Sequence, residues 1–134
     1  MSLIVDSSVW IDSFNPKIKS PEKELLKQLI SDDHPIYLCP IIYQEILQGI
    51  RDEKAFTKIK FILQHYGMIE MDLMLVTNYA IDLYRFLRKK GITIRKSVDC
   101  LIASYAILSD MHLLHNDSDF NQIARESKLK IFRV

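Results

Sequence analysis

The feature that most constrains the fold is an alternation of very short apolar runs with longer segments of helical pattern. The short runs are rich in Ile, Leu and Val, as buried strands are, and the longer segments repeat their apolar residues at helical spacing. Strands that alternate with helices predict an α/β fold, with a central parallel sheet that helices cover on both faces. The predicted strands are 3–5, 36–38, 68–71, 112–114 and 130–134, and the predicted helices are 9–11, 21–30, 40–50, 53–65, 73–90, 97–109 and 119–126.

Length and composition are those of one compact domain, so residues 1–134 are expected to form a single unit. Hydrophobic residues make up 49% of the chain, which is enough for a core, and the 3 glycines and 4 prolines argue against disorder. The 18 basic and 17 acidic residues leave a net charge of +1, which gives no indication of a strong nucleic-acid binder. Any RNA would have to be held by a local patch and by metal ions.

Neither the cysteines nor the hydropathy pattern indicates secretion or a membrane. Cys39 and Cys100 form no CxxC pair and show no zinc spacing with the histidines, so they are expected to be reduced and packed as small apolar residues. A strand pattern begins at residue 3 in place of a signal peptide, and no apolar run approaches the about 18 residues that span a membrane. The sequence therefore predicts a cytoplasmic location.

Four acidic residues stand where a solvated helix face does not explain them. Asp6 directly follows the first predicted strand, and Asp117 follows the fourth. Asp99 is the only charged residue of an otherwise apolar helix, and a buried charge needs a partner. Glu45 lies at the border of the apolar face of its helix. Each of three has an ordinary alternative: a turn or cap for Asp6, a first-turn cap for Asp99, and a surface position for Glu45.

A fifth acid, Asp119, shares the turn after the fourth strand with Asp117. One of the two is expected to cap the next helix, and its position favours Asp119, which leaves Asp117 to face a site. Ligands of parallel α/β sheets bind at the carboxyl ends of strands, so the acids are expected to converge there. Converging carboxylates repel one another unless a cation neutralises them, and oxygen ligands favour Mg²⁺ or Mn²⁺.

Four segments, in this order along the chain, resemble the motifs of the PIN domain nucleases, and closely those of the VapC-type toxins of bacterial toxin–antitoxin pairs. The segments are 3–11, 40–49, 98–103 and 113–120, and the resemblance covers essentially the whole chain. It implies a PIN-like α/β/α sandwich, a Mg²⁺ or Mn²⁺ site and endonucleolytic cleavage of RNA. It also implies a homodimer and neutralisation by a small antitoxin encoded beside the toxin.

Matched by motif, Asp6, Glu45, Asp99 and Asp117 take the four acidic positions of the family. The resemblance implies that Asp6 and Asp99 ligate the metal and that Asp117 assists directly or through water. Glu45 is expected to bind a second ion or to orient the attacking water.

Two basic residues, Arg95 and Lys96, stand just before the helix that carries Asp99. They are candidates for contacts to the RNA backbone, and a solvated basic turn is the alternative.

Other classes of protein fit the sequence less well. A haloacid-dehalogenase-like phosphatase requires a second acid two residues after the first, and this position is Ser8 here. A receiver-like interaction domain wants adjacent acids early in the chain and a lysine after a late strand, and neither is evident. A catalytically inactive module is at odds with the presence of all four acids. A PIN-like nuclease of RNA processing, without an antitoxin, remains an alternative.

Overall fold

The computed structural model describes residues 1–133, and its strands form one parallel sheet. The order across the sheet is β3-β2-β1-β4-β5, so β1 lies at the centre with β2 on one side and β4 on the other. All four pairings are parallel, which confirms the predicted α/β fold with a central parallel sheet. The strands are β1 (Leu3–Val5), β2 (Ile36–Leu38), β3 (Gly67–Met68), β4 (His112–Leu114) and β5 (Lys130–Ile131).

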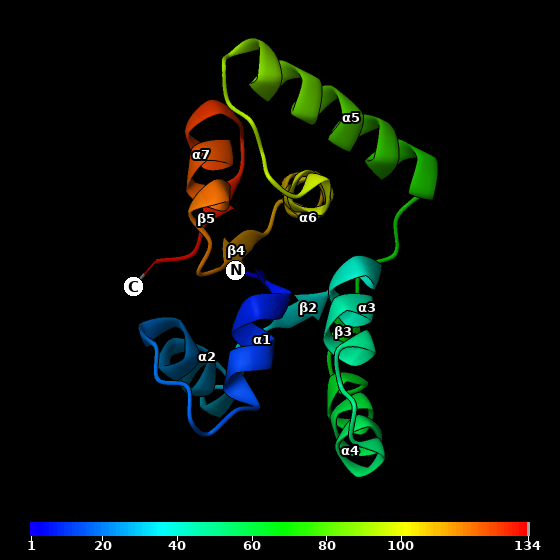
Figure 1. Cartoon of the computed structure of the whole chain (residues 1–134), viewed down its shortest axis with the longest axis vertical. Helices are drawn as coiled ribbons and strands as arrows, with labels where there is room; N and C mark the ends of the chain where they lie inside the picture. Colours follow the sequence, from blue (N-terminus) through cyan, green and yellow to red (C-terminus); the bar gives the residue numbers. More distant parts are fainter. Residues whose placement is uncertain (134) are drawn as a thin grey trace.

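Within residues 1–133, helices connect every pair of consecutive strands and cover both faces of the sheet. Figure 1 shows α6 between β4 and α5, with α1 and α2 on the other side of the strands. The chain moves in one direction across the sheet from β1 to β3 and in the opposite direction afterwards. Because crossovers between parallel strands are right-handed, the helices of these two halves cover opposite faces of the sheet. The helices are α1 (Ser7–Ser13), α2 (Pro21–Ser31), α3 (Pro40–Gln48), α4 (Glu53–Leu63), α5 (Leu73–Lys89), α6 (Ser97–Leu108) and α7 (Ser118–Glu126).

The helix ends follow local chemistry. Ser20 caps α2 by accepting the Lys23 N–H, with proline at the first helical position. Asp72 caps α5 in the same way, by accepting the Leu75 N–H. Gly91 follows α5 with φ of 81°, a left-handed conformation that favours glycine.

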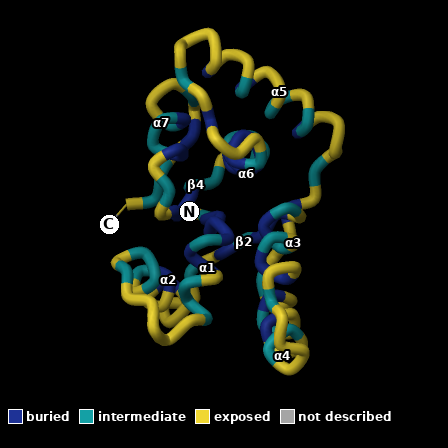
Figure 2. Tube along the Cα trace, in the orientation of Figure 1, coloured by how far each residue is buried: buried dark blue, intermediate teal, exposed yellow. Residues whose placement is uncertain are grey.

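The core lies on both faces of β1, whose residues Leu3 to Val5 are fully buried. Figure 2 shows α6 as the most deeply enclosed helix, as its nearly uniform apolar sequence predicts. Cys39 and Cys100 are buried and form no disulfide, so they pack as small apolar residues. Among residues 1–133, no helix combines the length and the apolar character needed to cross a membrane.

The two edge strands are shorter than predicted. β3 ends at Met68 instead of Met71, and β5 ends at Ile131, while Val134 lies outside the described residues. An edge strand has only one neighbour, so its pairing stops where that neighbour stops. After Met68, only the N–H of Ile69 still donates to β2, at 2.8 Å.

Candidate active site

The site lies where the direction of the chain across the sheet reverses, between β1 and β4. The Asp6 N–H donates to the carbonyl of Leu114 at 2.9 Å, so the carboxyl ends of these strands stay side by side. Parallel sheets place ligands at such a switch point. A cavity of about 530 Å³ opens there, and all four predicted acids line it. Its lining is Asp6, Ser7, Ser8, Ile11, Glu45, Gln48, Arg95, Lys96, Asp99, Asn116, Asp117 and Ser118.

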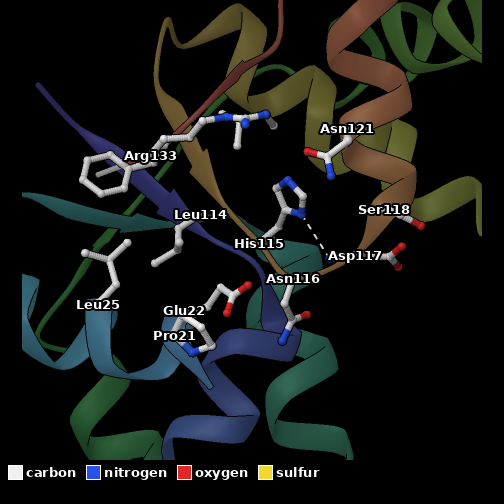
Figure 3. A pocket seen from close by; sticks show the side chains of 12 residues that line it. Pro21, Glu22, Leu25, Leu114, His115, Asn116, Asp117, Ser118, Asn121 and Arg133 are labelled. Carbon is white, nitrogen blue, oxygen red and sulfur yellow. Dashed lines mark hydrogen bonds between the residues drawn. The ribbon is translucent and has the colours of Figure 1, made fainter. Parts of the chain in front are cut away.

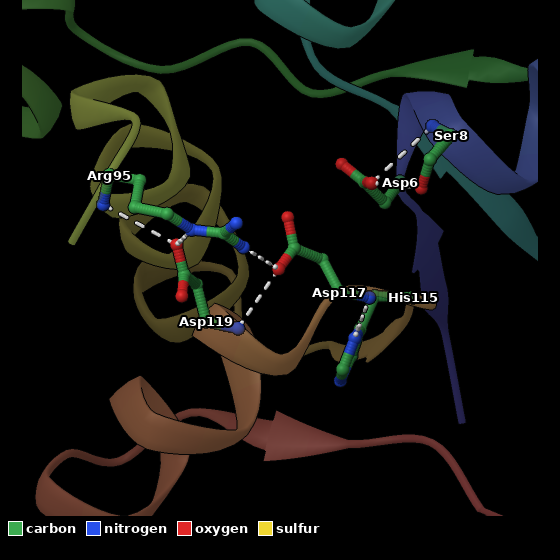
Figure 4. A network of polar contacts seen from close by, with 6 residues as sticks. All are labelled: Asp6, Ser8, Arg95, His115, Asp117 and Asp119. Atoms are coloured by element: carbon green, nitrogen blue, oxygen red, sulfur yellow. Dashed lines mark hydrogen bonds and ion pairs between the residues drawn. The ribbon is translucent and has the colours of Figure 1, made fainter.

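Asp6 combines the two roles that the sequence left open, since it caps a helix and also lines the cavity. Its Oδ2 accepts the N–H of Ser8 at 3.3 Å and the Ser8 hydroxyl at 2.5 Å (Figure 4). This cap starts α1 at Ser7, earlier than predicted. Burial raises the pKa of Asp6, and the hydrogen bonds from Ser8 offset part of that rise.

Glu45 reaches the same cavity from α3. The hydroxyl of Ser7, itself buried, donates to Oε1 of Glu45 at 3.0 Å. The first residue of α1 therefore orients a carboxylate that lies 38 positions later in the chain. Sequence analysis missed Ser7, although its place directly after Asp6 is a signal that it faces the same site.

Asp99 is a buried acid of the site whose pKa is raised. It lies in the first turn of α6 and is only 5% exposed. Its Oδ2 is buried and has no hydrogen-bond partner among residues 1–133. Burial, together with the charges of Asp6 and Asp117, raises the pKa of Asp99 to about 7. A cation bound beside it would stabilise such a buried carboxylate among like charges.

The expectation that Asp119 caps α7 was wrong, although Asp117 does line the cavity as expected. Asp117, not Asp119, caps α7, because its backbone is extended and its Oδ1 accepts the Asp119 N–H at 3.0 Å. Asp119 is buried in the first turn, and its Oδ2 lies 3.2 Å from Nε of Arg95. Nη2 of Arg95 lies 3.2 Å from Oδ1 of Asp117, so one guanidinium bridges both carboxylates (Figure 4).

A metal ion fits this cluster. Among the described residues, Asp99, Asp117 and Asp119 each place a potential ligand atom within 4.8 Å of the other two. The unpartnered Oδ2 of Asp99 is the donor that most needs a cation. Carboxylate oxygens alone suit a hard divalent ion. Asp119, which sequence analysis assigned to helix capping, is therefore a potential ligand.

The raised pKa of Asp99 predicts that the metal-free protein loses stability as the pH rises. The ordinary value is 3.8 and the folded value is about 7, so between these values the folded state holds a proton that the unfolded state has released. The stability that this proton provides is complete below about pH 4 and is lost as the pH rises through about 7. We expect the melting temperature in EDTA to fall over this range more for the wild type than for Asp99→Asn. Circular dichroism melts of both proteins measure it, and parallel profiles would contradict the assignment.

Fold and acid cluster together define a class. A model of the PIN domain matches residues 3–126, so the chain belongs to the PIN domain family. Ribonuclease VapC11 of Mycobacterium tuberculosis is 30% identical over 128 residues, which span 96% of each chain. The VapC ribonuclease Mb1587 of Mycobacterium bovis matches to the same extent. These relatives place the chain among the VapC-type members of the family and confirm the resemblance found in the sequence.

Solved structures agree on the fold. VapBC2 of Rickettsia felis, bound to a promoter DNA fragment, superposes with a TM-score of 0.76 at 23% identity over 98% of both chains. VapBC-1 of nontypeable Haemophilus influenzae gives a TM-score of 0.74 at 16% identity, over 98% of this chain and 97% of that one. The predicted PIN-like α/β/α sandwich is therefore confirmed.

Proposed function

We propose that this chain is a Mg²⁺- or Mn²⁺-dependent endoribonuclease that cleaves RNA phosphodiester bonds and is the toxin of a toxin–antitoxin pair. Its VapC relatives are named ribonucleases, and the chain shares their PIN domain over nearly its full length. The observation that carries metal dependence is the buried, unpartnered Oδ2 of Asp99 beside Asp6 and Asp117.

In this proposal, Asp6, Asp99 and Asp117 hold the ion, and Asp119 contributes its carboxylate beside Asp117. A divalent ion bound there would lower the pKa of the attacking water and offset charge on the phosphate. Glu45 orients the water, since its own orientation is set by Ser7.

Basic residues at the rim supply the contacts to RNA. Arg95 is 70% exposed although it bridges Asp117 and Asp119, so part of its guanidinium faces the cavity mouth. Lys96 is exposed on the same rim, close enough for its charge to lower the pKa of Asp99. Both lie where the backbone of an RNA in the cavity would pass.

Lys96→Gln is expected to raise the KM for RNA by roughly threefold, the size of one exposed charge contact, with little change in kcat. The slope of log binding constant against log salt should fall by about 0.7, because one phosphate contact is lost from a single strand. Steady-state cleavage at several salt concentrations measures both. Lys58→Gln on α4, an exposed lysine that does not line the cavity, is the matched control. Equal effects of the two substitutions would assign the result to net charge alone.

A small antitoxin is the proposed protein partner, since several solved relatives are toxin–antitoxin complexes. An arginine from the antitoxin would pair with the carboxylates of the cavity. We also propose a homodimer in the cytoplasm. Exposed apolar side chains on α5, including Leu73, Met74 and Ile81, are the surface that a dimer contact would bury.

Cleavage of a structured RNA in Mg²⁺, in Mn²⁺ and in EDTA tests the enzyme. The expected result is internal cleavage that EDTA abolishes, and no cleavage with either ion would overturn the proposal. Expression in a bacterial host, alone and with the adjacent small reading frame, tests the toxin. Growth arrest that co-expression relieves supports it. Cleavage without growth arrest would favour a PIN nuclease of RNA processing.

A further inference from the structure

A second cavity meets the acidic one at the turn after β4. It also measures about 530 Å³ and lies between the start of α2, the end of β4, α7 and the segment after β5 (Figure 3). The two cavities share Asn116, Asp117 and Ser118, so they lie on either side of this turn. The volume lies within the range of pockets that bind small ligands, about 300–1,000 Å³.

His115 provides a buried donor in this second cavity. The side chain is 8% exposed, and its Nδ1 accepts the N–H of Asp117 at 3.0 Å. Because Nδ1 accepts this hydrogen bond, the ring proton lies on Nε2, which is therefore a donor. This Nε2 is buried and makes no well-aligned hydrogen bond among residues 1–133, although the Asn121 side chain is close enough to raise the pKa of His115. Figure 3 shows it facing the space between Asn121 and Arg133.

The other polar groups of the cavity suit a neutral ligand with donors and acceptors. Asn121 offers an amide oxygen and an NH₂ group, whereas the NH₂ group of Asn116 already donates to Asp12 at 3.1 Å. Two carboxylates, Glu22 and Asp117, line the cavity against a single guanidinium, that of Arg133. A phosphate would therefore be repelled, whereas a nucleobase would meet amide groups and the Nε2–H of His115.

The cavity also has an apolar side that a base requires. Leu25, Leu114, Ile131 and Phe132 line it. Stacking on aromatic and apolar side chains is the usual sequence-tolerant part of base binding by proteins, and side-chain amides supply the selectivity.

We propose that this cavity binds the base of a nucleotide next to the scissile phosphate and thereby selects the sequence that is cleaved. The inference rests on the proposed ribonuclease function and assigns a specificity role to Asn121 and His115. The hydrogen bond from the backbone N–H of Asp117 to His115 connects this cavity to a residue of the acidic cavity.

Nuclear magnetic resonance with single-base RNAs tests the inference without cleavage. The protein is ¹⁵N-labelled Asp99→Asn in EDTA, with the wild type in EDTA as a second sample if the variant does not fold. The probes are pentanucleotides with one base (A, C, G or U) and four abasic positions, and a fully abasic pentanucleotide. We expect the Asn121 NH₂ and His115 ring signals to shift with at least one base and to remain unchanged with the abasic probe.

The Asn121→Ala variant should weaken binding of the preferred probe by about three- to tenfold, the loss of one hydrogen bond. Gln122→Ala, on the same helix but outside the cavity lining, should leave it unchanged. With wild-type residues elsewhere, cleavage of a randomised RNA should show a base preference at one position that Asn121→Ala relaxes and Gln122→Ala retains.

Equal affinity for all probes, or an unchanged base preference in Asn121→Ala, would overturn this inference. Cleavage by the wild type would still stand in that case, so the ribonuclease proposal would survive. Absence of RNA cleavage together with absence of binding by every probe would overturn both.

Discussion

Asp99→Asn is expected to lower RNA cleavage by about a hundred- to a thousandfold and to leave the fold intact. A bound cation supplies several kcal/mol of transition-state stabilisation, and the amide removes the ligand that most needs that cation. Asparagine has nearly the same shape as aspartate, so α6 should pack as before. Initial rates on a defined RNA in Mn²⁺ measure the loss, and circular dichroism checks the fold.

The matched control is Asp82→Asn, an exposed acid on α5 that does not line the acidic cavity. It should cleave at the wild-type rate. In EDTA, Asp99→Asn should unfold at a temperature no lower than the wild type at neutral pH, because it removes a buried charge that Asp6 and Asp117 repel. Near-normal cleavage by Asp99→Asn would show that this carboxylate does not ligate the catalytic ion.

Metal is expected to stabilise the folded protein strongly. Mn²⁺ at 100 times its dissociation constant adds about 2.7 kcal/mol to the free energy of unfolding. For a domain of this size, that corresponds to a rise of about 10 °C in melting temperature. Thermal melts in EDTA and in excess Mn²⁺, followed by circular dichroism, measure the difference.

Two features distinguish a shared metal site from nonspecific stabilisation. Asp99→Asn should lose most of the Mn²⁺ effect, whereas Asp82→Asn should keep it. The shift should also be larger at pH 8 than at pH 5, because a proton competes with the ion for Asp99, whose pKa is about 7 in the metal-free protein. A wild-type melting temperature that Mn²⁺ does not change would contradict a site built from these carboxylates.

Local patterns in the chain were sufficient to predict most of the fold. Short apolar runs identified the strands and longer segments of helical pattern identified the helices, because burial leaves a local signal in the sequence. Asp99 was recognisable in the same way, since it interrupts an otherwise apolar helix. The strand ends that carry Asp6 and Asp117 were predicted to meet because parallel strands end at one edge.

Contacts between distant segments could not be predicted in this way. The pairing of Asp117 and Asp119 with one guanidinium depends on Arg95, which lies more than 20 positions earlier in the chain. The orientation of Glu45 depends on Ser7 from another helix. The pattern of a helix or strand depends on residues a few positions apart in the sequence. The partner of a polar side chain depends instead on which groups the packed sheet and helices bring within hydrogen-bond distance.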